Sequence, residues 1–302
     1  SALKTENPFI QQMVDYLARS QGKRVRPALA VLAARHCGRV TEETIALGAA
    51  LEMLHVATLI HDDIIDNSAV RRKQKTLNFK WGNEVSVLMG DYVFASSFYL
   101  MAKNLPKDVL GILADTTNTI CRGEISETAN RFNVGLTLEE YEKIVREKTA
   151  CLFAASCQTG ALMAGAPPET TARFERFGLG IGMAFQIVDD TLDFVGRAKK
   201  VGKPVMSDLR EGKLTLPVLL CRERSSAAER KRIKAMILRK VKTPADFQRL
   251  AGLLKRTGAI ELSLTRAKEW VEEAKAAIAP LEEDRGKSEL LRFADFLLDR
   301  DF

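Results

Sequence analysis

The sequence predicts an all-α fold that forms a single domain. Apolar residues recur three and four positions apart along almost the whole chain, and the alternating runs typical of strands are few. No repeat, low-complexity linker or break in composition divides the 302 residues. A chain of this length can bury a substantial core in one large domain or in two ordinary ones. The unbroken pattern favours one domain over residues 1–302.

The expected helices follow one another with turns between them. Apolar residues from Phe9 to Leu17 begin the first helix, and Gly22 ends it. Thr41 is expected to cap a helix from about Glu42 to Asp66, because its hydroxyl can accept a hydrogen bond from an amide of the first turn. Four or five shorter helices are expected after Gly212. The long helices between these two regions are expected at about Asn83 to Lys103, Pro106 to Arg131, Leu138 to Ala164 and Pro168 to Phe194.

Composition and charge argue against several other classes of protein. Charged residues interrupt the apolar runs within about a dozen positions, whereas a helix needs roughly 20 apolar residues to cross a bilayer. The five cysteines form no CxxC pair, which is typical of free thiols in a reducing cytoplasm. The net charge is +7, and the most basic stretch, Glu229 to Lys242, has helical spacing and no aromatic residue. We therefore expect a soluble, cytoplasmic protein with no nucleic-acid partner and no stable membrane insertion.

A first acidic cluster follows the apolar run LEMLHVATLI, in the segment HDDIIDNSAVRR from His61 to Arg72. Asp62 and Asp66 are four residues apart, so they share one face of the expected helix, with Asp63 beside them. Carboxylates without a cysteine or an obligatory histidine favour a hard ion such as magnesium, which also binds phosphate oxygens. Taken alone, the cluster is equally well explained as an ordinary solvated helix end.

A second acidic cluster, in FQIVDDTLDFVG, repeats the DDxxD spacing. It consists of Asp189, Asp190 and Asp193, and Gln186 lies one turn earlier on the same helix face. Aspartate is a poor helix former, and like charges four residues apart destabilise a helix. Two such copies at the ends of apolar helices are therefore hard to attribute to chance. If the two clusters faced each other, they would hold a diphosphate through bridging metal ions.

Basic residues accompany both acidic clusters. The segment GKRVRP contains Lys23, Arg24 and Arg26. Arg71 and Arg72 follow the first cluster, and Lys203 and Lys213 follow the second. Arginine matches phosphate oxygens in pairs, and lysine supplies a mobile point charge. One diphosphate held by metal ions does not require this many cations. A second diphosphate, bound without metal, would account for the surplus.

Six segments in this order resemble the trans-type polyprenyl diphosphate synthases over nearly the whole chain. They are GKRVRP, LIHDDIIDNSAVRR, LMGDYVF, EKTA, FQIVDDTLDF and GKPVMSDLREGKLTLP. The resemblance implies an antiparallel helix bundle around a central cavity, usually in a homodimer. It also implies a magnesium-dependent prenyltransferase that condenses isopentenyl diphosphate repeatedly onto an allylic prenyl diphosphate, either farnesyl or geranylgeranyl diphosphate.

The resemblance further implies roles for individual residues. Three magnesium ions would be held by Asp62, Asp63, Asp66, Asp189, Asp190 and Asp193. Isopentenyl diphosphate would be bound by Lys23, Arg26, His55 and Arg72. The allylic diphosphate would be contacted by Arg71, Lys148, Thr149, Gln186, Lys203 and Lys213. The expected catalytic residues, which would steady the allylic cation and its leaving group, are Lys148, Thr149, Gln186 and Lys203.

Two small residues before the first cluster predict a long product. Thr58 lies one turn before Asp62 and Ala57 is adjacent, so both are expected to line the path of the growing hydrocarbon tail. In the family that the chain resembles, a bulky aromatic residue at either position stops growth at fifteen or twenty carbons. We therefore expect an octaprenyl product within a hexaprenyl to decaprenyl range. The floor of the tunnel would lie deeper, at Leu54, Met89, Phe94, Phe98 or Tyr99.

The sequence argues against two other functions and leaves a third open. A non-catalytic regulatory subunit would not need six intact aspartates, and a terpene cyclase usually has one DDxxD and no GKRVRP segment. A short-chain farnesyl or geranylgeranyl diphosphate synthase stays open as an alternative. The run GLGIG, from Gly178 to Gly182, superficially suggests a dinucleotide loop. It lacks the third glycine and lies inside an expected helix, so close helix packing explains it better.

Overall fold

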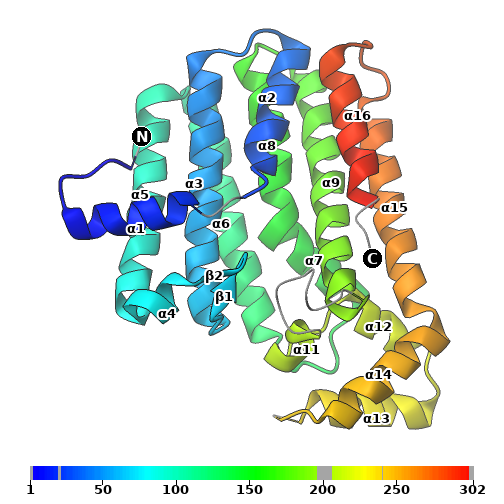
Figure 1. The fold of residues 1–302 in the computed structure, drawn as a ribbon. Coiled ribbons are helices and arrows are strands. Elements are labelled where there is room, and N and C mark those ends of the chain that lie inside the picture. The colour runs from blue at the N-terminus through cyan, green and yellow to red at the C-terminus, as the bar shows by residue number, and fades with distance from the viewer. Residues whose placement is uncertain (1–2, 20–21, 196–205, 240, 299–302) are drawn as a thin grey trace. The chain divides into compact units, whose positions relative to one another are not determined.

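The computed structural model describes residues 3–19, 22–195, 206–239 and 241–298 (Figure 1). Within these residues the chain consists of helices joined by turns and loops, together with one short two-stranded hairpin. The predicted all-α fold class is confirmed. Of the predicted site residues, Lys203 lies outside the described residues.

The chain groups into two compact units, and each is described by itself. The first comprises Ser1–Ala114 and Ser156–Thr171, and the second comprises Asp115–Ala155 and Ala172–Phe302. Three helices contribute residues to both units, namely α6 (Lys107–Ala129), α8 (Cys151–Met163) and α9 (Pro168–Val195). A single domain over residues 1–302 stays a prediction.

The first unit begins with a series of helices and one short hairpin. They are α1 (Pro8–Arg19), α2 (Val25–Cys37), α3 (Glu42–Ile65), β1 (Val70–Arg71), β2 (Gln74–Lys75), α4 (Leu77–Trp81) and α5 (Asn83–Asn104). Thr41 caps α3 as expected. Its hydroxyl accepts a hydrogen bond from the amide of Thr44, and the Thr44 hydroxyl accepts one from the amide of Thr41. The β1–β2 hairpin and the short helix α4 were not predicted.

Helix α3 forms the centre of the first unit because its apolar faces meet neighbours on several sides. It packs along α2 and α5, and its residues Met53, Ala57 and Ile60 join Met89 and Val93 of α5 in one buried cluster. By length and composition alone, α3 and α5 could each cross a membrane. In this unit the two helices pack against each other, and α3 ends in the aspartates of the first cluster.

The second unit contains the first part of one long helical run and a series of shorter helices. The expected helix from Leu138 to Ala164 is confirmed as α7 (Leu138–Val145), a π-helical turn η1 (Arg146–Ala150) and α8 in direct succession. A short helix, α11 (Ser207–Glu211), precedes Gly212. After it, the described residues form α12 (Leu216–Glu223), α13 (Ala227–Ile237), α14 (Pro244–Thr257), α15 (Ala259–Ile278) and α16 (Arg285–Leu298).

The GLGIG run lies inside α9 and brings three helices close together. A Cβ atom on Gly178 would lie 2.4 Å from the carbonyl oxygen of Phe153, and one on Gly182 would lie 2.5 Å from the Cα of Ala150. On another side of the helix, a Cβ on Gly180 would lie 2.8 Å from the carbonyl oxygen of Trp270. Only a residue without a side chain allows such contacts. Close helix packing is therefore confirmed as the reason for these glycines.

Candidate active site

The first aspartate cluster lies at the C-terminal end of α3, in the first unit. Asp62 and Asp66 are partly exposed and share a helix face, while Asp63 is buried. The Asp63 carboxylate accepts a hydrogen bond of 2.7 Å from Nε of Arg71. Its backbone carbonyl accepts a second one from the side-chain amide of Asn78. Asp63 therefore holds the hairpin against α3, whereas Asp62 and Asp66 present their carboxylates on another face.

The β1–β2 hairpin carries Arg71 and Arg72 back towards the start of α2. Its turn residues Arg72 and Lys73 have φ angles of 50° and 65°, a left-handed conformation that glycine or asparagine usually adopts. A Cβ atom on Gly22 would lie 2.7 Å from Nη1 of Arg72. The Arg72 guanidinium therefore lies against the backbone of the GKRVRP segment. Strained turn residues of this kind cluster at functional sites.

His55 lies among arginine side chains in the same unit. Burial holds the pKa of His55 well below its usual range, and three arginine charges act in the same direction. In order of decreasing effect they belong to Arg26, Arg72 and Arg71. The imidazole is therefore neutral at pH 7 and can donate one hydrogen bond without adding charge. A neutral donor among three guanidinium groups is suited to binding a polyanion such as a diphosphate.

The low pKa of His55 predicts a pH-dependent stability. An unfolded histidine takes up a proton below about pH 6.5, whereas folded His55 stays neutral there, so the unfolded state binds more protons. The stability that this residue contributes is therefore complete above about pH 6.5 and decreases as the pH falls, by at most about 1.4 kcal/mol per pH unit. Urea unfolding between pH 7 and pH 5 should show a shallower slope for His55→Gln than for the unchanged protein. Equal slopes for the two proteins would contradict the lowered pKa of His55 in the folded state.

In the second unit, two of the three aspartates of the second cluster are held by hydrogen bonds. The buried Asp190 carboxylate accepts a hydrogen bond of 2.5 Å from the Tyr141 hydroxyl and another of 2.7 Å from Nε2 of Gln186. Asp193 accepts hydrogen bonds from the amide and hydroxyl of Ser207, at 3.0 and 2.8 Å, at the start of α11. Asp189 is exposed. Burial raises the pKa of Asp190 to about 7, although the hydrogen bonds that it accepts oppose this shift.

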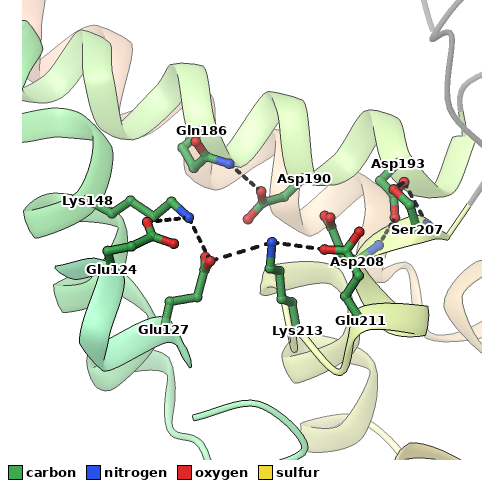
Figure 2. Close-up of polar contacts among 10 residues, drawn as sticks. All are labelled: Glu124, Glu127, Lys148, Gln186, Asp190, Asp193, Ser207, Asp208, Glu211 and Lys213. Carbon is green, nitrogen blue, oxygen red and sulfur yellow. Dashed lines mark hydrogen bonds and ion pairs between the residues drawn. The ribbon is translucent and has the colours of Figure 1, made fainter. Parts of the chain in front are cut away.

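A network of lysines and glutamates lies beside the second cluster (Figure 2). Nζ of Lys148 lies 2.7 Å from Oε2 of Glu124 and 2.7 Å from Oε2 of Glu127. Nζ of Lys213 lies 3.7 Å from the same oxygen of Glu127 and 2.9 Å from Oε2 of Glu211. The two lysines thus share one carboxylate, which fixes where their positive charges lie.

Asp208 adds a further carboxyl group to this network. Burial raises the pKa of Asp208 well above its usual range, the charges of Asp193 and Asp190 raise it further, and Lys213 opposes them. Several carboxyl groups close together in a buried region disfavour full ionisation. An added cation would relieve this repulsion, so the region is suited to binding a divalent ion or a positively charged group.

The π-helical turn places two predicted catalytic residues. In η1 the amide of Cys151 donates to the carbonyl of Arg146, five residues earlier, and π turns of this kind are frequent at functional sites. The turn contains Lys148 and Thr149, and the Thr149 hydroxyl donates a hydrogen bond of 3.0 Å to Oε1 of Gln186. Because Gln186 in turn donates to Asp190, the predicted residues Lys148, Thr149, Gln186 and Asp190 lie together in one unit.

Several residues of this site were missed by the sequence reasoning. They are Glu124, Glu127, Tyr141, Asp208 and Glu211. A signal existed for two of them, because Glu124 and Glu127 are three residues apart and share a helix face. Asp208 and Glu211 lie inside the segment GKPVMSDLREGKLTLP, where no role was assigned to them.

The two predicted chain-length residues differ in their surroundings. Ala57 is 1% exposed and belongs to the apolar cluster of the first unit, whereas Thr58 is partly exposed and donates a hydrogen bond to the carbonyl of His55. Among the floor candidates, Met89 is buried beside Ala57 in the same cluster. Tyr99 is 64% exposed, with the Lys103 ammonium 4.5 Å from its ring centre, so its ring lies at the surface of the unit.

The donor set fits a hard, hydrated cation. Among the described residues, no group of three or more histidine, cysteine, aspartate or glutamate side chains forms a metal cage. Magnesium instead usually keeps several waters and binds through one or two carboxylates together with substrate phosphates. Asp62 and Asp66 on one helix end, and the exposed Asp189 on another, supply carboxylates of this kind.

Comparison with known proteins identifies the family. The Polyprenyl synthetase family model matches residues 7–254. A relative from Geobacillus stearothermophilus, heptaprenyl diphosphate synthase component 2, is 38% identical over 290 residues, which cover 94% of this chain and 88% of that protein. The octaprenyl diphosphate synthase of Haemophilus influenzae is 34% identical over 300 residues, 99% of this chain and 91% of that protein. The short chain isoprenyl diphosphate synthase of Methanothermobacter thermautotrophicus is 34% identical over 294 residues, 95% of this chain and 89% of that protein.

Solved structures agree with this result. The decaprenyl diphosphate synthase of Rhodobacter capsulatus is 35% identical with a TM-score of 0.94, covering 99% of this chain and 92% of that one. A polyprenyl synthase of Caulobacter crescentus, complexed with calcium and isoprenyl diphosphate, is 36% identical with a TM-score of 0.94, covering 99% and 91%. The fold is therefore the all-α fold of the isoprenoid synthases. The chain belongs to the polyprenyl synthetase family and is a prenyl transferase.

Proposed function

We propose that this enzyme condenses isopentenyl diphosphate repeatedly onto an allylic prenyl diphosphate, farnesyl or geranylgeranyl diphosphate. The product would be a long-chain all-trans polyprenyl diphosphate, octaprenyl within a hexaprenyl to decaprenyl range. The single observation that carries the choice of a long product is the small pair Ala57 and Thr58 before the first aspartate cluster. Relatives named as heptaprenyl and octaprenyl diphosphate synthases support it. A relative named as a short chain synthase keeps the shorter product as the second candidate.

Magnesium is the proposed cofactor, with three ions expected when the allylic diphosphate is bound. Asp62, Asp66 and Asp189 are the proposed direct ligands, because they are partly or fully exposed, whereas Asp63, Asp190 and Asp193 are buried. These last three aspartates would position the helix ends instead. The bound ions would neutralise the charge that develops on the departing diphosphate.

The chain's own residues would guide the remaining steps. Neutral His55 and the guanidinium groups of Arg26 and Arg72 would hold isopentenyl diphosphate, and Lys23 would contribute a mobile charge. Arg71, Lys148, Lys203 and Lys213 would stabilise the leaving allylic diphosphate. The hydroxyl of Thr149 and the side-chain carbonyl of Gln186 would direct their dipoles at the allylic cation. After the double bond of isopentenyl diphosphate has attacked, the released diphosphate would take up the proton that the new product loses.

The assembly and location of the enzyme are also proposals. A homodimer in the cytoplasm is the expected state. The name of the Geobacillus stearothermophilus relative, component 2, favours a second candidate in which this chain acts together with a different subunit. Size-exclusion chromatography with light scattering on the purified chain, beside an elongation assay without any partner, distinguishes an active homodimer from a chain that needs a second component.

The experiment that tests the proposed function is a product analysis. The purified chain is incubated with farnesyl diphosphate, labelled isopentenyl diphosphate and magnesium, and the products are separated by chain length. A ladder ending near forty carbons supports the proposal. Products of twenty carbons or fewer would refute the tunnel argument, cyclic hydrocarbons would indicate a terpene cyclase, and no elongation would indicate a regulatory subunit.

Replacing Ala57 with phenylalanine is expected to shorten the product. The added ring would enter the apolar cluster formed with Met53, Met89 and Val93 and would narrow the proposed tunnel. Overpacking this cluster is also expected to cost about 1–3 kcal/mol of stability, so the melting temperature is measured beside the product length. A soluble, folded A57F variant with an unchanged product would show that the hydrocarbon tail follows another path.

A further inference from the structure

A groove of about 680 Å³ lies in the second unit, between α13 and α14. None of its residues belongs to the candidate active site. Its apolar floor includes Ile233, Met236 and Leu250, which are almost fully buried. Its charged walls are formed by Glu229, Arg232, Arg239, Asp246, Arg249 and Arg256.

The groove has an excess of positive charge. Nη1 of Arg239 lies 2.7 Å from Oδ2 of Asp246, and Nη2 of Arg256 lies 2.6 Å from Oε1 of Glu229. Hydrogen bonds at the helix caps lower the pKa of both carboxyl groups, so these are ionised at neutral pH and each balances one arginine. Arg232 and Arg249 are exposed, and within the described residues neither forms an ion pair. Two permanent positive charges therefore face the opening.

Two exposed apolar residues flank Arg239 in the sequence, at one end of the groove. Leu238, the residue after the end of α13, is 52% exposed, and Val241 is 78% exposed. Gly252 in α14 lines the groove, and a Cβ atom there would meet no atom within 4 Å. Glycine weakens a helix interior relative to alanine, and here no packing contact requires it. Because Gly252 has no side chain, the backbone of α14 itself lines the groove at this position.

We propose that this groove binds the phosphate headgroup of an anionic membrane lipid, with Leu238 and Val241 entering the interfacial layer of the bilayer. The excess charge complements an anionic lipid surface, and exposed apolar residues near a basic groove are typical of peripheral membrane contact. A free inorganic anion would make no use of the apolar floor and rim. Nucleic acid is disfavoured because none of the residues that line the groove is aromatic. The proposal concerns where the chain meets a bilayer and does not rest on the reaction proposed above.

Vesicle co-sedimentation of the full chain tests the proposal. Vesicles of phosphatidylglycerol with phosphatidylcholine are compared with vesicles of phosphatidylcholine alone, at low and high salt. We expect partition onto the anionic vesicles only, weakened by salt. The double variant R232E/R249E should partition at least about 25-fold less, since each basic residue near an anionic surface contributes about fivefold. L238A/V241A should also bind less while keeping the salt dependence.

A matched variant separates the groove from net charge. K107E/K268E makes the same change in net charge on exposed lysines of α6 and α15 and should bind nearly as the unchanged protein. An equal loss in this variant, no binding by the unchanged protein, or equal binding to vesicles of phosphatidylcholine alone would each overturn the proposal. Elongation assayed in detergent without vesicles should be the same for R232E/R249E and the unchanged protein. A failure of the proposed reaction would instead appear there as no elongation by either.

Discussion

Replacing Asp62 with asparagine is expected to lower kcat/KM for elongation by about 100- to 1,000-fold, the size of effect seen when one preorganised electrostatic group is lost. Asp62 is partly exposed and shares a helix face with Asp66, so its carboxylate is proposed to bind a metal ion together with substrate phosphate. The same replacement at Asp63 is expected to act mainly on stability, because that carboxylate binds Arg71.

Magnesium titrations distinguish the two variants. D62N should raise the magnesium concentration that gives half-maximal activity. D63N should leave that concentration unchanged and should lower the free energy of unfolding by about 1–3 kcal/mol, the cost of an unsatisfied buried partner. An equal shift of the magnesium requirement in both variants would show that the two aspartates do not divide their roles in this way.

Replacing Lys148 with alanine is expected to remove most of the activity and to destabilise the protein. Its ammonium group lies between Glu124 and Glu127, and all three side chains are largely buried. Without it the two carboxylates repel each other, at a cost of about 1–3 kcal/mol. The variant also lacks a positive charge next to Thr149, where the allylic diphosphate is proposed to ionise, so kcat should fall by about 100-fold or more.

A second variant separates these two effects. K148A/E127Q removes one of the repelling charges and should recover part of the lost stability in urea unfolding, while its kcat stays low. Lys143→Ala, an exposed lysine of α7 in the same helical run, should leave both quantities nearly unchanged. If the double variant regained activity together with stability, Lys148 would have only a structural role.

The helices could be predicted because the signals that define them are local. The cap at Thr41 depends on a residue three positions away, and α5 begins at Asn83 and ends at Asn104, one residue beyond the predicted end. The glycines of GLGIG could likewise be interpreted without a structure, since glycines inside an apolar helix usually have a packing reason.

The hydrogen-bond partners of the individual aspartates in each DDxxD could not be predicted. Every copy of the motif has the same spacing, and the partners that distinguish its members come from elsewhere in the chain. Asp63 binds Arg71 eight residues away, Asp193 binds Ser207 fourteen away, and Asp190 binds Tyr141 forty-nine away. Such pairings depend on the fold and not on local pattern.

Two backbone features also had no sequence signal. Turns with positive φ angles are normally recognised by glycine or asparagine, but the hairpin turn has Arg72 and Lys73 instead. The π turn at Arg146–Ala150 consists of ordinary helix-forming residues. In both places tertiary packing overrides local preference, and in both places the residues concerned are predicted substrate ligands or their neighbours.

The π turn has a consequence for how length changes in the chain would be tolerated. Each residue of an α-helix advances the side-chain direction by about 100°, so the extra residue in η1 sets the rotational phase between α7 and α8. Deleting one residue from this turn would give a regular helix, yet it would rotate Tyr141 away from Asp190 or Thr149 away from Gln186. Within the run from Leu138 to Met163, the π turn therefore sets the relative rotation of the side chains before and after it. A deletion in this run is expected to disturb the site more than most substitutions do.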